Sequence, residues 1–257
     1  MTQYKFDPNY DQNMLKITRL GHINRYIFVE QKIAENFDRP VHVLDAASGF
    51  GHGSFRLAQN ELVAYVLGVE YDAETLELSR DRYKSPKLEF LRADLEQKLS
   101  FARPFDVVAS IETIEHINNP AETLRNFHDC LTDDGLLIIS TPNGKNTSDE
   151  GWKFSQRDSH IGLPKGTLHV KEYSREEMRA LLDDAGFTQP QEFGLYVLFG
   201  YAIKFSKVKV DSHTDNPASG LSKRILENLP FVSEIFAKPY PFLVDSAKNI
   251  IYVSRKK

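Results

Sequence analysis

The sequence between residues 42 and 142 alternates short apolar runs with longer segments of helical periodicity, and this alternation limits the fold more than any other feature. Parallel strands are buried on both faces and are joined by crossover helices, so they read as apolar runs separated by amphipathic stretches. The pattern therefore predicts βα units around a parallel sheet, as in a doubly wound α/β domain. The five runs are HVLDAA (42–47), YVLGVEYD (65–72), LEFLRAD (88–94), PFDVVASIE (104–112) and GLLIISTP (135–142).

The remaining segments complete one domain rather than a second one. A helix is expected at 53–63 after the first run, and another begins at Ser174, whose capping box with Glu177 marks a helix start. QEFGLYVLF and NIIYVSRK predict a sixth and a seventh strand. The expected division is an N-terminal helical extension (1–40), a cofactor-binding core (41–197), an insertion or lid (198–247) and the last strand (248–257).

Composition limits the class of partner. With 257 residues and 41% hydrophobic content the chain can bury one large core, and its net charge of -4 supplies no overall basic field for nucleic acid or an anionic membrane. Residues 198–257 are locally basic, with ten Lys/Arg against five Asp/Glu. The single cysteine, the lack of a signal-peptide pattern and the lack of a long apolar run lead us to expect a cytoplasmic protein without a membrane span.

The segment LDAASGFGHGS leaves the first predicted strand and enters a helix, and it carries Gly49, Gly51 and Gly53. A doubly wound sheet binds its nucleotide at such a turn, where glycine lets a ligand approach the backbone. Ser54 stands where the dinucleotide fingerprint requires a glycine, which argues against a nicotinamide-dependent oxidoreductase. Glu70 closes the second strand about twenty residues on, in position to accept two hydroxyl hydrogen bonds from a ribose.

These residues, together with Asp45 before the glycines and Asp94 after the third strand, resemble the class I S-adenosylmethionine-dependent methyltransferases over residues 41–197. The resemblance implies a seven-stranded sheet with an antiparallel last strand, and S-adenosylmethionine as cofactor. It assigns Asp45 and the glycines to the methionine portion, and Glu70 to the ribose. It assigns Tyr71 to the adenine face and Asp94 with Leu95 to the adenine amino edge. The positions expected to contact the cofactor are Asp45, Ala47, Gly49, Gly51, Gly53, Glu70, Tyr71, Asp94, Leu95 and Ser110.

The stretch SIETIEHINNP places two carboxylates and an imidazole at the end of the fourth predicted strand. Residues three and four apart share a helical face, so Glu112, Glu115 and His116 can converge. Three interpretations compete. The glutamates can simply favour a helix N-terminus, His116 can act alone as a general base, or a cation can relieve the repulsion between the carboxylates.

His169, in LHVKEYSREEM, is the candidate fourth ligand. The pattern E-x-x-E-H followed by H-x-x-E-Y-S-R-E-E resembles the metal-dependent small-RNA 3′-terminal ribose methyltransferases. Its first half resembles the O-methyltransferases of ubiquinone biosynthesis. The resemblance implies a metal site of Glu112, Glu115, His116 and His169, for Mg²⁺ or Mn²⁺ with Zn²⁺ ranking below them. An ion there would grip the accepting hydroxyl and its neighbour, and would lower the pKa of the hydroxyl.

Two neighbouring oxygens that chelate one ion predict a vicinal diol or catechol as the methyl acceptor. ISTPNG and HVKEYSREEMRALLDDAGF resemble bacterial methyltransferases of polysaccharide and glycan biosynthesis, so O-methylation of a sugar or sugar conjugate is our first expectation. A catechol or quinone precursor and an RNA 3′-terminal ribose are the alternatives, although the acidic net charge counts against RNA.

The sequence does not decide what the basic region 198–247 contacts. It can meet the phosphates of a phosphorylated, nucleotide-linked or lipid-linked sugar, form a homodimer contact, or be a solvated surface. A catalytically silent, cofactor-binding scaffold is the hypothesis from a different class. The cluster of like charges at 112–116 argues against it, because a silent protein has no physical need for such a cluster.

Overall fold

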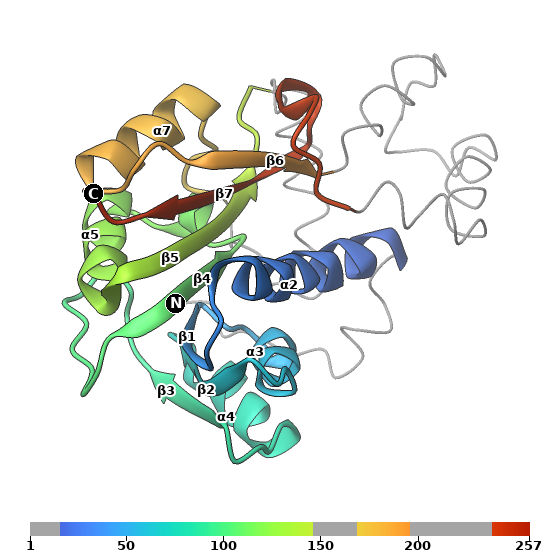
Figure 1. Cartoon of the computed structure of the whole chain (residues 1–257), viewed down its shortest axis with the longest axis vertical. Coiled ribbons are helices and arrows are strands. Elements are labelled where there is room, and N and C mark those ends of the chain that lie inside the picture. The colour runs from blue at the N-terminus through green and yellow to red at the C-terminus, as the bar shows by residue number, and fades with distance from the viewer. Residues whose placement is uncertain (1–15, 146–168, 196–237) are drawn as a thin grey trace.

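The computed structural model describes residues 16–145, 169–195 and 238–257. Within them, seven strands form one sheet in the order β3-β2-β1-β4-β5-β7-β6 (Figure 1). Strands β1 to β5 pair in parallel, and β7 runs antiparallel to both β5 and β6, which confirms the predicted fold class. The strands are β1 Val41–Ala46, β2 Val63–Glu70, β3 Leu88–Arg92, β4 Phe105–Ile111, β5 Leu131–Pro142, β6 Gln191–Leu195 and β7 Asn249–Arg255.

Helices cover both faces of the sheet, and each face has its own core (Figure 1). Ile33 and Leu57 bring two helices onto one face, and Phe127 and Leu182 bring two others onto the opposite face. All four side chains are fully buried, and each contributes roughly 1.5–3 kcal/mol to stability. The helices are α2 Lys16–Asn36 and α3 His52–Ala58 on the first face, α5 Pro120–Cys130 and α7 Arg175–Asp184 on the second, α4 Ala73–Arg82, and the short 3₁₀ helices η1 Ile114–His116 and η2 Val244–Ser246.

The helices begin where side chains cap them. The Ser174 hydroxyl accepts from the amide of Glu177, whose carboxylate accepts from the amide of Ser174, so the predicted capping box is confirmed. Asp72 caps α4 through its own carboxylate, which accepts from the amide of Thr75 at 2.7 Å. Both caps lie directly after segments that approach the carboxyl edge of the sheet, so they fix the loops at that edge.

The helix predicted at 53–63 is wrong at its C-terminal end. It ends at Ala58, and the amide of Leu62 is bonded to the side chain of Asn60 in a turn. Val63 already pairs with Val41 as the first residue of β2. Pairing with the sheet buries Val63 completely, and this tertiary contact overrides the helical period of the sequence.

Strands β1 and β4 are neighbours although β2 and β3 lie between them in the sequence. The chain therefore winds in one direction from β1 and in the other from β4. A doubly wound sheet binds ligands in the crevice at the carboxyl ends of such a pair. The segments that follow β1 and β4 are the glycine loop and the turn of residues 112–116, so the topology brings the two predicted sites to the same edge.

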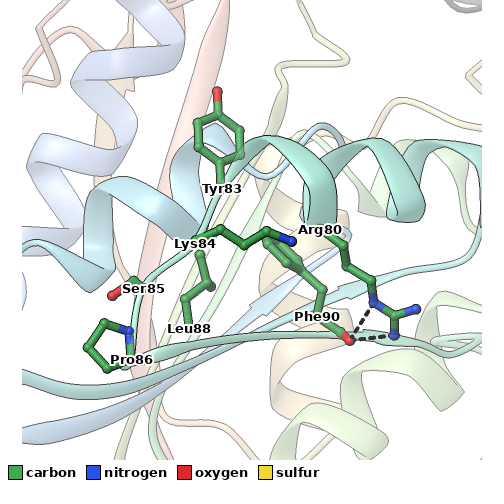
Figure 2. A pocket seen from close by; sticks show the side chains of 7 residues that line it. All are labelled: Arg80, Tyr83, Lys84, Ser85, Pro86, Leu88 and Phe90. Atoms are coloured by element: carbon green, nitrogen blue, oxygen red, sulfur yellow. Dashed lines mark hydrogen bonds between the residues drawn. The ribbon is translucent and has the colours of Figure 1, made fainter.

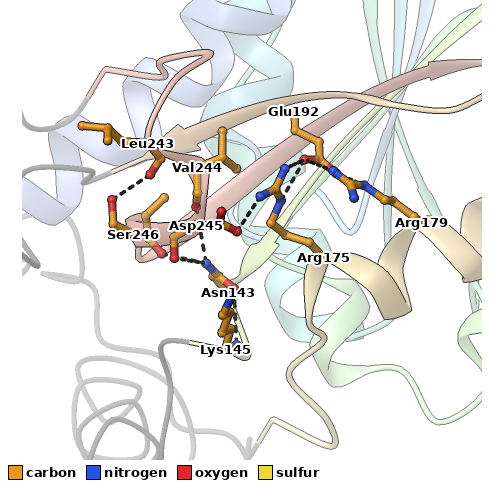
Figure 3. A network of polar contacts seen from close by, with 10 residues as sticks. Asn143, Lys145, Arg175, Arg179, Glu192, Leu243, Val244, Asp245 and Ser246 are labelled. Atoms are coloured by element: carbon orange, nitrogen blue, oxygen red, sulfur yellow. Dashed lines mark hydrogen bonds and ion pairs between the residues drawn. The ribbon is translucent and has the colours of Figure 1, made fainter.

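A polar network joins α7, β6 and the end of β5 to η2, the turn that leads into β7 (Figure 3). Arg175 and Arg179 on α7 both pair with Glu192 on β6, and Arg175 also pairs with Asp245 in η2. The side chain of Asn143, at the end of β5, donates to carbonyls of η2 and of Ala247, the latter at 3.1 Å. The predicted insertion at 198–247 falls outside the described residues except for 238–247, and the network fixes that end of it.

A groove of about 500 Å³ lies between the C-terminal end of α4 and the edge strand β3 (Figure 2). Its lining carries two basic side chains, Arg80 and Lys84. The guanidinium of Arg80 donates to the outward carbonyl of Phe90 at 2.7 Å. This bond caps a polar group on the open edge of the sheet, which is a structural task.

Candidate active site and cofactor site

The glycine loop uses each of its three glycines differently. Gly49 has φ +52°, and a Cβ built on it would meet nothing within 4 Å, so open space lies beside the backbone there. Gly51 has φ +78°, and its Cβ would lie 2.6 Å from the ring of Phe90. Gly53 would bring a Cβ to 1.9 Å from the ring of Tyr26. Gly49 is therefore the glycine that leaves room for a ligand, whereas Gly51 and Gly53 allow close packing.

Asp45, at the end of β1, lies under this loop. Its carboxylate accepts from the hydroxyl of Ser54 at 2.5 Å and from that of Tyr26 at 3.2 Å, and the residue has no exposed surface. Burial raises the pKa of Asp45 to about 6, although both hydroxyls favour its ionised form. In this arrangement the Asp45 carboxylate is fully covered and holds the loop through Ser54 and Tyr26, and its contact with the methionine portion stays a prediction.

Glu70 closes β2 as predicted and organises the backbone around it. One carboxylate oxygen accepts from the amide of Gly49 at 3.0 Å, and the other accepts from the amides of Tyr71 and Asp72, each at 2.9 Å. Burial raises its pKa, while the three amides act in the opposite direction. The carboxylate joins the ends of β1 and β2, and the ring of Tyr71 beside it is 65% exposed.

The two residues predicted to meet the adenine amino edge differ in exposure. Asp94 is partly buried, and its carboxylate accepts from the amide of Glu96 at 2.9 Å. The side chain of Leu95 is 6% exposed and belongs to the core beneath α5, where Asn126 donates to its carbonyl. Only the backbone of Leu95 can therefore face a ligand, as its side chain points into the protein.

The ends of β1 and β4 carry strained backbone. Ala47 has φ +62° and Glu112 has φ +52°, a region that residues with a Cβ rarely adopt. Such strain costs on the order of 1–3 kcal/mol and collects at functional sites. Next to these residues, the buried hydroxyls of Ser48 and Ser110 have no hydrogen-bond partner within the described part of the chain. Strain and unsatisfied oxygens thus coincide at the β1–β4 crevice.

The turn after β4 buries one of the two predicted glutamates almost completely. Glu115, within η1, is 1% exposed, and one of its carboxylate oxygens accepts from the hydroxyl of Thr141 at 3.1 Å. Its other oxygen is buried and has no partner among the described residues. Burial, and then the nearby charge of Glu112, raise the pKa of Glu115 well above its ordinary value. The hydroxyl of Thr141 and the charge of Arg25 act in the opposite direction.

Two histidines lie beside Glu115. The rings of His116 and His169 are 4.8 Å apart in an edge-to-face arrangement, and the ligand atoms of Glu115, His116 and His169 lie within 4.8 Å of one another. The backbone carbonyl of Glu115 accepts from the amide of Val170 at 2.7 Å, which places His169 against η1. The structure therefore brings together three of the four residues that the sequence predicted as metal ligands.

Glu112 lies apart from this group of three. Its carboxylate accepts from Ser140 at 2.8 Å and from Asn249 at 2.6 Å, and it pairs with Arg25 at 3.3 Å. The spacing rule that predicted convergence holds for helical residues, but η1 begins only at Ile114 and Glu112 has left-handed backbone. Glu112 thus joins β4 to β5, β7 and α2.

Sequence reasoning missed the contribution of α2 to this edge. His22, Arg25 and Tyr26 lie three and four residues apart on that helix. Arg25 reaches Glu112, Tyr26 reaches Asp45, and His22 lies 6.4 Å from the ring of His52 in the glycine loop. Burial, followed by the charge of Arg25, lowers the pKa of His22 to about 3, so its ring is neutral at physiological pH. The polar spacing on one helical face was the available signal.

Comparison with known proteins identifies the family of this chain. The methyltransferase-domain family matches residues 22–191, which is more than half of the chain. The chain belongs to the methyltransferase-domain family. This confirms the resemblance to class I S-adenosylmethionine-dependent methyltransferases, and S-adenosylmethionine is the cofactor that membership indicates.

Two relatives and one solved structure illustrate the match. A probable S-adenosylmethionine-dependent methyltransferase of Mycobacterium tuberculosis is 32% identical over 154 residues, 60% of this chain and 51% of that protein. The ubiquinone biosynthesis O-methyltransferase of Ruegeria pomeroyi is 30% identical over 188 residues, 71% of this chain and 74% of that one. The magnesium protoporphyrin IX methyltransferase of Synechocystis, solved with bound SAH, shares the fold with a TM-score of 0.58 at 15% identity, over 94% of this chain and 86% of that one.

The alignment spans about half the length of the mycobacterial relative, so its similarity concerns the shared domain. Within the described ranges, each helix is too short or too polar to cross a bilayer.

Proposed function

We propose that the chain transfers the methyl group of S-adenosylmethionine to one hydroxyl of a vicinal pair on a small molecule, with a divalent cation held by Glu115, His116 and His169. The single observation that supports this proposal most is the buried carboxylate oxygen of Glu115. It has no partner among the described residues, and it lies beside two imidazoles within ligand distance of one another. A cation would supply the missing partner for that oxygen.

The cofactor half of the site fits S-adenosylmethionine, which supplies the methyl group when bound. The open space beside Gly49 admits a ligand against the loop backbone, and the exposed ring of Tyr71 offers a face to the adenine. Glu70 lies between them and would accept from the ribose hydroxyls. Ser110 carries a buried hydroxyl that lacks a partner within the described residues, in keeping with its predicted place next to the cofactor.

The half of the site that would hold the methyl acceptor, here called the acceptor half, contains Glu115, His116 and His169. These three ligands suit Mn²⁺ better than Mg²⁺. Mg²⁺ prefers oxygen ligands, whereas two imidazoles and one carboxylate suit first-row transition metals. When bound, such an ion lowers the pKa of a hydroxyl that contacts it. Glu112, which the sequence assigned to the metal, is proposed instead to hold the turn through Arg25 and Asn249.

The acceptor is proposed to carry two neighbouring hydroxyls, because a single ion can hold both. A sugar or sugar conjugate was the first expectation from the sequence. The relative named for ubiquinone biosynthesis, at 30% identity, supports a dihydroxyaromatic acceptor as the alternative. The basic region 198–257 supports a phosphorylated or nucleotide-linked acceptor in the first case.

The test is methyl transfer from methyl-labelled S-adenosylmethionine to a catechol, a sugar nucleotide and a ribonucleoside, with added Mn²⁺ or with EDTA. We expect transfer to one of the diols that requires the metal and is lost in Glu115→Gln. Glu122→Gln, which changes an exposed carboxylate paired with Arg125 on α5, serves as the control and should retain full activity. Full activity in EDTA would contradict the metal and leave His116 as a lone base.

A further inference from the structure

Glu172 is a buried acid next to the proposed metal site, and the sequence pattern that contains it gave it no role. One of its carboxylate oxygens lies 2.5 Å from Nδ1 of His169, and its side chain is only 5% exposed. A carboxylate at that distance accepts a hydrogen bond, so Nδ1 carries the proton. Nε2 is then the nitrogen of His169 whose lone pair is available to a cation.

The backbone around His169 is fixed without Glu172. The amides of Val170 and Lys171 both donate to the carbonyl of Glu115, at 2.7 and 3.2 Å. The carbonyl of Tyr173 accepts from the amide of Gly144 at 2.9 Å, and the capped helix α7 follows at once. These bonds hold the position of the chain, whereas the contact with Glu172 acts on the ring of His169 itself.

We propose that Glu172 is a positioning residue that holds His169 with its proton on Nδ1 and directs Nε2 toward Glu115 and His116. This inference rests on the proposed function, since it names the residue that prepares one of the three ligands. A carboxylate that accepts from a ligand histidine fixes its tautomer and raises its basicity. Removal of such a partner commonly lowers metal affinity 10- to 100-fold.

A purely structural role for Glu172 makes a different prediction. If the carboxylate only anchored the segment, its loss would lower the melting temperature and leave the metal affinity unchanged. Glu177 provides the matched control, because it is an acid of the same segment that pairs with Lys171 at 2.7 Å and closes the capping box. It lies outside the group of three ligands.

The experiment is calorimetric titration of the full-length chain with Mn²⁺ in wild type, Glu172→Leu, Glu172→Gln and Glu177→Leu. Glu172→Leu is expected to raise the Kd for Mn²⁺ by about 10- to 100-fold. Glu172→Gln, which keeps an acceptor oxygen, should raise it less. Glu177→Leu should lower the melting temperature without a change in Kd. Equal Kd values for wild type and Glu172→Leu would overturn the positioning role and leave the metal site intact.

Ring nitrogen NMR of His169 separates this proposal from the proposed function. If the wild type failed to bind Mn²⁺, the metal-dependent function would be contradicted, and the tautomer would still report on Glu172. A proton on Nδ1 in wild type that becomes shared between both nitrogens in Glu172→Leu supports the positioning role. The same tautomer distribution in both proteins overturns it.

Discussion

The two halves of the carboxyl edge treat their buried charges in opposite ways. At the ends of β1 and β2, Asp45 accepts from two hydroxyls and Glu70 from three backbone amides, so the two carboxylates of the cofactor half are satisfied by the protein itself. At the ends of β4 and β5, Glu115 retains a buried oxygen without a partner in the described residues, although two imidazoles lie beside it. The carboxylates of the first half are fully bonded, whereas one carboxylate oxygen of the second half is not.

The difference in hydrogen bonding between the two halves indicates how each of them can bind a ligand. Carboxylates that already accept hydrogen bonds from the protein hold the loops of the cofactor half in place. This half can therefore bind S-adenosylmethionine through its shape and through the few groups that remain exposed. A buried carboxylate with an unsatisfied oxygen is destabilising until a proton or a cation reaches it. The acceptor half therefore gains stability when it binds, and its residues should matter for turnover more than for the fold.

The largest expected effect is on kcat, and it comes from a substitution in the acceptor half. His116→Ala should reduce kcat by about 100- to 10,000-fold, because the imidazole acts on the reacting hydroxyl as a ligand or as a base. The Kd for S-adenosylmethionine should stay within a factor of about two or three, since the cofactor half is intact. Steady-state kinetics and cofactor titration measure both quantities. His42→Ala, at the opposite end of β1, is the control, and equal losses in both variants would contradict the assignment.

The next largest effect is on the pH dependence of stability, and it tests the buried carboxylate of the cofactor half. Burial raises the pKa of Asp45 to about 6 from 3.8, so the folded protein binds this proton more tightly than the unfolded chain does. The contribution of Asp45 to stability is complete below pH 3.8 and is lost as the pH rises through about 6, with a magnitude on the order of 3 kcal/mol. In urea unfolding curves, wild type should lose stability relative to Asp45→Asn over this range.

Asp106 supplies the control of opposite sign. It is buried, but the hydrogen bonds from Arg39 and from the amide of His42 outweigh burial and lower its pKa. Its contribution is present above the unfolded pKa and is lost as the pH falls. Relative to Asp106→Asn, wild type should gain stability with rising pH. Parallel curves for wild type and Asp45→Asn would show that Asp45 is not buried as described.

A smaller effect is expected on cofactor affinity, from a substitution in the cofactor half. Glu70→Ala removes the carboxylate that joins Gly49 to the end of β2, and hydrogen bonds to a charged group contribute about 1.5–3 kcal/mol. The Kd for S-adenosylmethionine should rise by roughly 10- to 100-fold, while kcat at saturating cofactor changes little. Calorimetry with the cofactor tests this. A loss confined to kcat would place Glu70 in the acceptor half instead.

The smallest effect separates two glycines of one loop. Gly53→Ala forces a Cβ to 1.9 Å from the ring of Tyr26 and should lower the free energy of unfolding by about 1–3 kcal/mol. Gly49→Ala meets open space and should cost only about 1–2 kcal/mol for its positive φ, but its methyl group should weaken cofactor binding. Chemical unfolding and cofactor titration of both variants give the comparison. A cofactor affinity that falls only in Gly53→Ala would reverse the assignment.

Local patterns in the sequence predicted the parts of this molecule that depend on neighbours in the chain. The apolar runs predicted the strands, and the capping box at Ser174 predicted the start of α7. Glu70 was found because its place at the end of a strand is itself a local feature. The family resemblance, rather than a local pattern, predicted that His169 lies beside Glu115 and His116, and the three side chains do lie together.

The contacts that the sequence did not predict span long distances in the chain. Arg25 pairs with Glu112 only because α2 packs across the end of β4, and the burial of Asp45 depends on Tyr26 from the same helix. Gly53 looked like a ligand-facing glycine, yet the ring of Tyr26 occupies the space beside it. The position of α2 is set by its apolar face, which a motif read in isolation does not include.

Electron paramagnetic resonance of Mn²⁺ tests most directly whether the acceptor half is completed by a cation. The signal of free Mn²⁺ should decrease by one equivalent when wild-type protein is added, and it should return with Glu115→Gln, which removes the charge of the unsatisfied carboxylate. An undiminished free signal with wild type, or equal binding by Glu115→Gln, would contradict the account.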